Sequence, residues 1–494
     1  MTYKIVVVGG GTAGVMAATY FKAYWGDQVD VTAIYDHSKP GIGVGESLTP
    51  MFDSYLKRVG VSTIDVIKNC NATIKLGLKF KNWTTEGHWA YHNFPFNPAA
   101  ESVDATTFMY NAVDAYDVLH NQYDGAYGYG DFHYENNLIP SHDNTIFRHA
   151  LHLDANLIGR YIEDKFKDSI RFLDGIIQDV IVENNNIKEI VLTSGEKFTA
   201  DLFIDCTGLA RVLMTKLGAE WIDRTDLLPT DRNIPNPVFK TYEHIPPYTT
   251  AEATKNGWIL DVPLSNRRGC GYTYSSRFTT DEEAREDFNA WLLKTHGVPL
   301  ASDRIIKFSS GYLKDPWIGN CVAIGLSSGF IEPLEATSLH HVIVTTARMV
   351  KQNCLTNQQW DRDNFNKLSG EMYENAYEYI RFFYHTGRTD SPFWQYMHDS
   401  TPDWLTSMTE KMKHSFLSEF DMVRKDVMFD STSFVAVAAG HNIFTPEGCQ
   451  RYLDTRAYYD QAKAAADKVR EIKAAYYHEA VDHKQWIDYV RTQL

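Results

Sequence analysis

A glycine-rich turn between an apolar run and a helical segment lies at the start of the chain. Lys4–Val8 predicts a buried strand, and Val15–Phe21 predicts a helix. Between them, Gly9, Gly11 and Gly14 have the spacing of the dinucleotide-binding fingerprint. The first glycine allows a tight turn, the second lets a pyrophosphate approach the backbone, and the third lets helix and strand pack closely. The alternative is a glycine-rich turn in an ordinary α/β unit, but the two flanking elements favour dinucleotide binding.

An acidic residue follows the second predicted strand. Val29–Tyr35 predicts this strand, and Asp36 comes directly after it, 22 residues beyond Gly14. In dinucleotide-binding folds an acid at this place binds the ribose hydroxyls. Asp36 is therefore the predicted ribose ligand.

Two further segments contain glycines that fit the same cofactor. Gly41, Gly43 and Gly45 occupy alternate positions, which indicates a backbone that is mobile or closely approached. This segment is either a flap over the cofactor or a plain surface loop. Residues 201–208 predict a strand and then a turn at Gly208, which would return the chain to the cofactor side of the sheet.

Residues 325–338 combine a glycine-rich turn, carboxylates and the expected start of a helix. They follow the apolar run Cys321–Ile324, which predicts a strand. Thr337 or Ser338 is expected to cap the helix, whose free backbone amides carry partial positive charge and suit a small anion. Glu335 beside such a site is electrostatically unfavourable, which indicates a role in proton handling. The alternative is a capped helix after a turn, without a ligand.

A strand is predicted around Lys79. In residues 75–81 every second side chain is apolar, which is the period of a strand. Lys79 shares the other face with Lys75 and Lys81. By pattern alone, Lys79 is a solvent-facing strand lysine.

Composition limits the class of protein. The formal net charge of -15 and an isoelectric point of about 5.6 argue against nucleic-acid binding. No run of 18 apolar residues predicts a membrane span, and the chain begins without a signal-peptide pattern, so a cytoplasmic protein without a membrane partner is expected. The six cysteines lack zinc-ligand spacing and are expected to be reduced, and no metal is expected.

The rest of the chain is predicted to contain further strands and a helical carboxyl-terminal part. Residues 172–199 predict a β-meander with its turn at Asn184–Asn186. Residues 256–275 and 304–312 predict strands of a second, more antiparallel sheet. The chain beyond residue 350 is predicted to be mainly helical.

Residues 84–150 are rich in aromatic residues and histidines, and they predict loops and helices outside the nucleotide-binding part. Their histidines have no repeated ligand spacing, which favours structural roles. His92 is a candidate for the substrate site.

Together these segments resemble the flavin-dependent halogenases of the tryptophan-halogenase family. The resemblance runs from residue 1 to about 350 and more loosely to the end. Its most specific part is Phe330–Thr337, with the sequence Phe-Ile-Glu-Pro-Leu-Glu-Ala-Thr. The other segments that carry it are residues 9–14, 41–47, 79–83, 201–208, 268–275 and 320–337.

The resemblance implies a two-component enzyme. A separate flavin reductase would supply reduced FAD (FADH2), which with O2 would oxidise a halide ion (chloride, bromide or iodide) to hypohalous acid. The acid would pass through a tunnel to Lys79, which directs it at an electron-rich aromatic small molecule. Glu335 would orient the oxidant or take the proton of the arene, and the backbone amides of Thr337 and Ser338 would hold the halide. The cofactor-binding candidates are Gly9, Gly11, Gly14, Asp36, Gly43, Gly45, Gly208 and Gly325.

Three departures from the family pattern affect the site. The Trp-x-Trp-x-Ile-Pro signature appears as Trp258–Pro263, and Leu260 replaces a tryptophan of a wall thought to keep substrate off the flavin. Ser338 stands where glycine is usual. The family's acid after the second strand falls on Tyr35, so Asp36 serves only if the register shifts by one residue.

The aromatic walls that hold tryptophan in relatives are not evident. His92, Phe94 and Phe434 are the substrate-contacting candidates, while most other side chains in residues 433–440 are small. We therefore expect weak or no activity on free tryptophan and activity on several phenols, anilines or small indoles. The alternative is a specific substrate held by the aromatic-rich residues 88–134.

The predicted fold class is α/β, with an FAD-binding flavoprotein module (Rossmann-like, glutathione-reductase type) and a mostly helical substrate region. The module is expected to span residues 1–380, with residues 84–150 contributing to the substrate region. Residues 381–494 would form a mostly helical part that completes the substrate pocket. Two alternatives are a single-component flavin-dependent aromatic monooxygenase and a flavin-binding protein with a decayed halogenase site. A homo-oligomer is compatible with the sequence.

Overall fold

The computed structural model describes residues 2–38, 46–84, 90–93, 137–139, 149–415, 417–422, 424, 427–441, 443–445, 447–448, 450–451, 454, 464, 471 and 480–493. The chain separates into two units, each made of three segments. The first unit comprises Met1–Ala72, Leu153–Pro229 and Lys307–Glu374, and the second comprises Thr73–His152, Thr230–Ile306 and Asn375–Leu494. The division expected from sequence has one boundary, at residue 380, whereas these units alternate along the chain. Which part carries which function stays a prediction.

A six-stranded sheet forms the centre of the first unit. Its order is β21-β22-β13-β1-β2-β9, and all neighbours are parallel except β21 and β22. The strands are β1 Tyr3–Val8, β2 Val29–Tyr35, β9 Arg171–Asp174, β13 Leu202–Asp205, β21 Trp317–Ile318 and β22 Cys321–Ala323. Since the carboxyl ends of parallel strands share one edge, the loops after β1, β2, β13 and β22 meet there.

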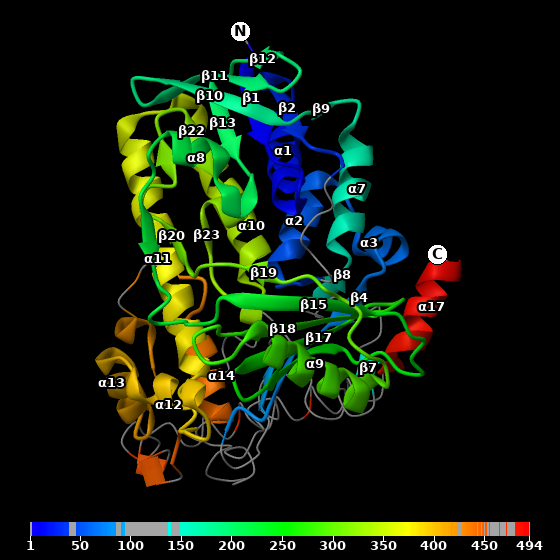
Figure 1. The fold of residues 1–494 in the computed structure, drawn as a ribbon, viewed down its shortest axis with the longest axis vertical. Helices are drawn as coiled ribbons and strands as arrows, with labels where there is room; N and C mark the ends of the chain where they lie inside the picture. The colour runs from blue at the N-terminus through cyan, green and yellow to red at the C-terminus, as the bar shows by residue number, and fades with distance from the viewer. Residues whose placement is uncertain are drawn as a thin grey trace. The chain divides into compact units, whose positions relative to one another are not determined.

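Helices and a second small sheet cover the central sheet of the first unit. The helix α1 packs on β1 and β2 and also contacts α2, α7 and α10 (Figure 1). A meander and the helix α8 bury apolar side chains against the central strands. The elements named here are α1 Thr12–Trp25, α2 Met51–Val59, α7 Ala155–Phe166, α8 Val212–Lys216, α10 Thr337–Lys351, β10 Ile177–Glu183, β11 Asn186–Leu192 and β12 Lys197–Phe198.

Residues 51–70, whose sequence predicts a helical stretch, form two helices. The helix α2 ends at Gly60, which adopts the left-handed conformation with φ 67°. The next helix, α3 Thr63–Asn69, begins with a capping box in which Ser62 and Asp65 bond each other's backbone N–H groups. The first unit also contains an antiparallel sheet of β14 Trp221–Asp223, β20 Gly311–Leu313 and β23 Gly329–Phe330.

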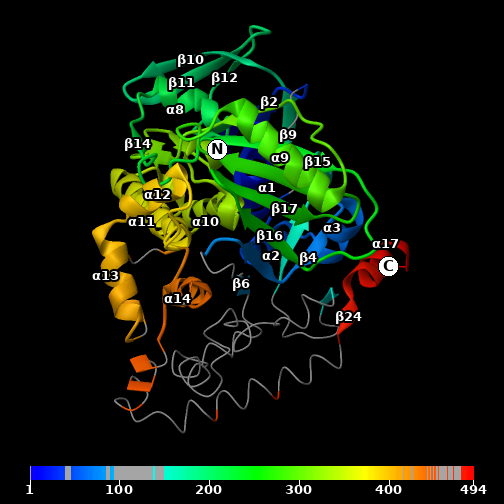
Figure 2. The same cartoon turned by 60° about the horizontal axis from the view of Figure 1, so that its bottom comes forward.

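A seven-stranded sheet forms the centre of the second unit, in the order β19-β15-β18-β17-β16-β5-β6. The pairs from β15 to β16 and the pair of β5 with β6 are antiparallel, while β16 and β5 are parallel. The helix α9 Asp281–His296 lies along one face of this sheet (Figure 2). The strands are β5 Gly77–Lys81, β6 Ala90–Asn93, β15 Arg232–Val238, β16 Tyr248–Ala253, β17 Gly257–Pro263, β18 Arg268–Tyr274 and β19 Ile306–Lys307.

The described residues of the carboxyl-terminal part are mainly helical, as predicted. The long helix α11 Gln359–Phe383 is followed by α12 Pro392–Asp399, α13 Asp403–Met412, α14 Ser431–Gly440 and α17 His483–Gln493. Among the described residues of the second unit, β4 Thr73–Lys75 also pairs with β8 Ala150–Leu153, and β7 Leu138–Ile139 pairs with β24 Val481–Asp482. In the described part of the chain, every helix is too short or too polar to cross a bilayer.

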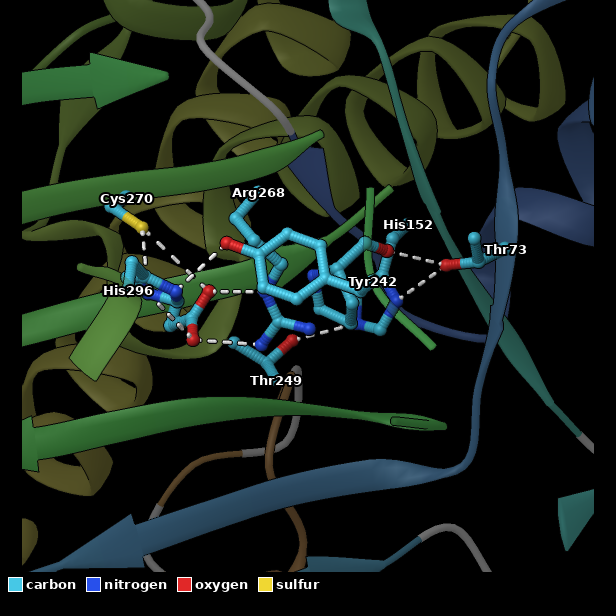
Figure 3. Close-up of polar contacts among 9 residues, drawn as sticks. Thr73, His152, Tyr242, Thr249, Arg268, Cys270 and His296 are labelled. Atoms are coloured by element: carbon cyan, nitrogen blue, oxygen red, sulfur yellow. Dashed lines mark hydrogen bonds and ion pairs between the residues drawn. The ribbon is translucent and has the colours of Figure 1, made fainter. Parts of the chain in front are cut away.

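The sequence of residues 152–161 predicts a helix that starts at His152, and this predicted start is wrong. His152 lies in β8, where its ring bonds Thr73 at 3.0 Å and Thr249 at 2.9 Å (Figure 3). The helix α7 begins after Asp154, whose carboxylate accepts hydrogen bonds from the first free amides of the helix.

Candidate active site

The loop after β1 is tightly packed at two glycines and open at the third. Gly9 has φ 117°, and a Cβ atom there would lie 2.1 Å from the carbonyl oxygen of Cys206. A Cβ at Gly14 would lie 1.9 Å from the carbonyl oxygen of Gly9, so both positions require glycine. At Gly11, which precedes α1 without any side-chain cap, nothing lies within 4 Å of such a Cβ. This open space beside free helix amides fits the pyrophosphate of a dinucleotide.

The end of β2 presents two residues near the expected ribose position. The Asp36 carboxylate accepts hydrogen bonds from the backbone N–H of Ser38 at 3.0 Å and from its hydroxyl at 2.5 Å, which forms a local turn. The ring of Tyr35 covers Gly10, and its hydroxyl donates to Glu163 at 2.6 Å. Burial and the Glu163 carboxylate raise the pKa of Tyr35, so this hydroxyl stays protonated. Asp36 as the ribose ligand stays a prediction.

Asp205, at the end of β13, is a buried carboxylate that the sequence reasoning did not single out. Its oxygens accept hydrogen bonds from the backbone N–H and hydroxyl of Thr207 and from the amides of Leu213 and the next residue, at 2.7–3.0 Å. The hydroxyl of Ser327 lies 3.0 Å from Asp205 Oδ1 and 3.1 Å from the carbonyl of Gly208. Asp205 therefore connects the two turns that follow β13 and β22. The sequence signal that could have identified Asp205 is an acid at the end of a predicted strand, shortly before the turn at Thr207 and Gly208.

Both of these turns contain a glycine in the left-handed region. Gly208 has φ 69°, and a Cβ there would meet nothing within 4 Å. Gly325 has φ 71°, and a Cβ there would lie 2.8 Å from the Cβ of Ala13. Gly43 and Gly45 lie outside the described residues. In the first unit, the structure thus gathers Gly9, Gly11, Gly14, Gly208 and Gly325 at one edge of the sheet.

The turn before α10 differs from the predicted cap. Ala336 adopts the left-handed conformation, with φ 55° and ψ 33°, and is itself the N-cap residue, without a side-chain hydrogen bond. The prediction that Thr337 or Ser338 caps the helix is wrong, because the chain enters helical geometry already at Thr337. Glu335 and Thr337 are only 4% and 1% exposed. A buried carboxylate therefore lies two residues before a helix N-terminus that no side chain caps, which is compatible with the predicted anion site.

Lys79 lies in β5 of the second unit, opposite Thr250 of β16 and Tyr91 of β6. It is half-buried, and its Nζ atom is 5.7 Å from the centroid of the Tyr248 ring. The expected row of solvent-facing lysines is wrong at Lys75, which is 1% exposed. The pattern fails there because Lys75 belongs to β4, which is paired with β8. A half-buried lysine over an aromatic face is compatible with the role implied for Lys79.

The substrate candidates are only partly described. His92 lies in β6 opposite Leu78, and Phe94 falls outside the described residues. Phe434, in α14, is buried against Phe382 and Tyr379, with ring centroids 6.0 and 5.3 Å away. Contact of these three side chains with substrate stays a prediction.

The strand β17 carries the altered wall motif. Leu260 is half-buried and pairs with Ala251 and Gly271 on the neighbouring strands. Trp258 is fully buried, and its indole N–H donates to the hydroxyl of Tyr384 at 2.9 Å. The indole that remains in the motif is thus a fixed core residue, while the replaced position is the more accessible one.

Asp261 in the same strand belongs to a buried cluster with Arg268, Cys270 and His296, the last three of which are labelled in Figure 3. Both of its oxygens accept from Arg268 at 2.7 Å, and His296 Nε2 lies 3.5 Å away. Asp261, Cys270 and His296 place ligand-type atoms within 4.8 Å of one another. Burial opposes ionisation of Asp261, but Arg268 and His296 hold its pKa well below the usual range. Because Arg268 already supplies the positive charge, and burial raises the pKa of the Cys270 thiol, the cluster favours a structural role over metal binding.

Comparison with known proteins places this geometry in a family. The family model for tryptophan halogenase matches residues 4–485. Tryptophan 7-halogenase RebH from Lentzea aerocolonigenes is 31% identical over 420 residues, which cover 79% of this chain and 78% of that protein. Tryptophan 6-halogenase SttH from Streptomyces toxytricini is 28% identical, covering 83% and 84%.

A solved structure agrees with these relatives. Tar14, a tryptophan C-6 flavin-dependent halogenase from taromycin biosynthesis, superposes with a TM-score of 0.88 at 27% identity, covering 99% of this chain and 100% of that one. The agreement confirms the predicted α/β flavoprotein class. Since the family model spans nearly the whole chain, and a relative above 30% identity covers most of it, this chain belongs to the tryptophan-halogenase family of flavin-dependent enzymes.

Proposed function

We propose that this chain halogenates an electron-rich aromatic small molecule, using reduced FAD, O2 and a halide ion, with a separate flavin reductase as its partner. The observation that carries the proposal is the turn Glu335–Thr337. There a buried carboxylate precedes a left-handed alanine and a helix N-terminus without a side-chain cap. Such a helix end suits a small anion, and a nearby carboxylate can receive a proton.

The residues present fit FAD. The open space at Gly11, beside the amides of α1, would receive the pyrophosphate, and Asp36 would bind the ribose. The turns at Gly208 and Gly325, connected through Asp205, would lie on the flavin side of the site. Bound reduced FAD would activate O2, which takes two electrons from the flavin and two from the halide, so that hypohalous acid and water are formed.

Lys79 and Glu335 divide the chemistry on the arene. Lys79 would hold hypohalous acid by a hydrogen bond, or carry its halogen as a haloamine, and present it to the ring. The carbon–halogen bond forms as the oxygen–halogen or nitrogen–halogen bond breaks, and Glu335 would take the proton that leaves the ring carbon. A positioned acid or base contributes a factor of roughly a hundred or more to such a step.

The substrate is proposed to be broader than free tryptophan. Leu260 is half-buried and replaces a wall tryptophan, and a flexible aliphatic wall accepts several flat rings with modest affinity. Discrimination of one amino acid requires rigid walls and buried polar partners for its charged end. The competing proposal is tryptophan itself, which the named relatives act on according to their descriptions.

The test measures product, with each component left out in turn. NADPH and FAD alone should give no halogenated arene, and adding an unrelated flavin reductase should give product only when halide is present. Rapid NADPH oxidation by the purified chain alone would favour a single-component monooxygenase. Flavin binding without product under any halide would indicate a decayed site.

A further inference from the structure

The helix α10 has two consecutive histidines near its start, and of these only His341 bonds Thr337, the first residue of the helix. The Nδ1 atom of His341 lies 2.9 Å from the carbonyl oxygen of Thr337. Because a carbonyl oxygen can only accept, Nδ1 carries the hydrogen and donates it. His340 instead lies 3.0 Å from the hydroxyl of Thr49.

The imidazole of His341 is held in place by rings behind it. It stacks on Tyr373, with centroids 4.2 Å apart and planes at 11°, and Tyr373 stacks on Tyr312 at 5.2 Å and 6°. A Cβ atom at Gly329 would lie 2.6 Å from the Tyr373 ring, so the backbone of β23 abuts that ring. His341 is 3% exposed and fixed in orientation by this packing.

The surroundings of Nε2, the second ring nitrogen of His341, indicate that the hydrogen-bond donor at Nδ1 is the reason for a histidine at this position. Nε2 is buried and has no hydrogen-bond partner among the described residues. Burial lowers the pKa of His341 to about 3, so the ring is neutral with its hydrogen on Nδ1. A buried acceptor without a partner is unfavourable. Phenylalanine could fill the same stack without that penalty, so the donor at Nδ1 is what histidine contributes here.

The geometry points to His341 as a positioning residue for the halide, an inference that rests on the proposed function. The carbonyl of Thr337 and the N–H of Ser338 belong to one planar trans peptide group and point in opposite directions. A hydrogen bond that fixes the carbonyl therefore fixes the direction of the Ser338 amide. Ala336 holds an unfavourable left-handed conformation just before it, and such a turn persists only where its surroundings determine it.

Two substitutions at position 341 separate the effect of the hydrogen-bond donor at Nδ1 from the effect of the packed ring. His341→Phe keeps the stack and removes the donor, whereas His341→Asn keeps an N–H at the same distance from the backbone and removes the ring. With reductase and arene saturating, we expect His341→Phe to raise the halide KM about tenfold, the effect of one lost hydrogen bond. Reoxidation of reduced flavin by O2 should be unchanged. His341→Asn should stay within about threefold of the wild type, as should the neighbouring control His340→Phe.

A third variant, His341→Gln, moves the donor by one bond and is expected to raise the halide KM as well, which keeps the test open if His341→Phe does not fold. A wild-type halide KM in His341→Phe, or in His341→Gln should that variant alone fold, would overturn the inference. So would an equal rise in the phenylalanine and asparagine variants, which would assign the effect to packing. Absence of halide-dependent product from the wild type itself would overturn the proposed function, before any variant is compared, and this inference with it.

Discussion

The imidazole of His483 accepts a hydrogen bond from the backbone N–H of Ile74, at 3.0 Å from Nε2, although the two residues are 409 positions apart. Its Nδ1 donates to the carbonyl of Ile245 at 2.9 Å. The ring is fully buried, so both nitrogens are used in the neutral form. This contact attaches the start of α17 to the edge of β4 in the second unit.

The first prediction is that the buried His483 makes the stability of the folded chain sensitive to acid. Burial lowers the pKa of His483 to about 4, so on acidification the unfolded chain binds the proton first. The contribution of neutral His483 to the free energy of unfolding is fully present above about pH 6.5 and is lost as the pH falls towards 4. The largest loss is about 3 kcal/mol. Urea midpoints at several pH values should fall less between pH 7 and 5 in His483→Gln than in the wild type. The exposed His244→Gln is the control, and equal slopes in all three proteins would contradict the assignment.

The second prediction concerns Arg268 and Asp261. Arg268→Met removes the guanidinium that bonds both oxygens of the buried Asp261 carboxylate and leaves it with His296 alone, so it should lower the free energy of unfolding by about 3–5 kcal/mol. The double variant Arg268→Met/Asp261→Asn should recover part of this loss, because the uncompensated charge is gone. Lys188→Met, at an exposed pair with Glu183, should cost less than about 1 kcal/mol. If the effects of Arg268→Met and Asp261→Asn on the denaturation midpoint simply add in a double-mutant cycle, the two side chains are not coupled and the prediction is contradicted.

The third prediction tests the dinucleotide loop. Gly11→Ala meets no protein atom within 4 Å, so the fold should persist, but the methyl group enters the space expected for the pyrophosphate. We expect FAD affinity, measured by flavin fluorescence, to fall at least about tenfold. Gly159→Ala is the matched control, since it also points into open space but lies in α7. Unchanged FAD affinity in Gly11→Ala would remove this loop from the cofactor site.

The fourth prediction concerns substrate breadth. A panel of phenols, anilines, small indoles and tryptophan, assayed with each halide, should give product from several arenes and little from tryptophan. Leu260→Trp restores the wall indole of the family motif and should narrow the set of arenes converted. Efficient conversion of tryptophan at one ring position, with the other arenes inert, would refute this prediction.

Periodicity and turn chemistry predicted the parts of the fold that depend on local sequence. Val29–Tyr35 is a strand with the bounds expected. The turn of the meander lies at Asn184 and Asn185, both with positive φ, which asparagine tolerates better than most residues. The glycine loop after β1 could be predicted because steric crowding leaves no other residue at Gly9 and Gly14.

The conformation of the turn Glu335–Thr337 could not be predicted from local sequence rules. Serine and threonine are preferred caps, so a left-handed alanine at 336 runs against the usual signal and is imposed by its surroundings. The hydrogen bond between His341 and Thr337 joins residues at ordinary helical spacing, so the sequence does not distinguish it. It is recognised as a positioning contact only when the burial of His341 and its stacking on Tyr373 are known. Lys75 appeared solvent-facing because its burial comes from the pairing of β4 with a strand about 75 residues later.

The central claim is that Lys79 directs halogen to the arene while the flavin chemistry occurs elsewhere. The most direct measurement follows halogenated product by mass spectrometry and flavin reoxidation by absorbance, in wild type, Lys79→Ala, the same-strand control Lys81→Ala and Glu335→Gln. We expect Lys79→Ala to lose product while flavin reoxidation continues, Lys81→Ala to retain both, and Glu335→Gln to lower turnover by roughly a hundredfold or more. Halogenation by Lys79→Ala at the wild-type rate and regioselectivity would contradict the account.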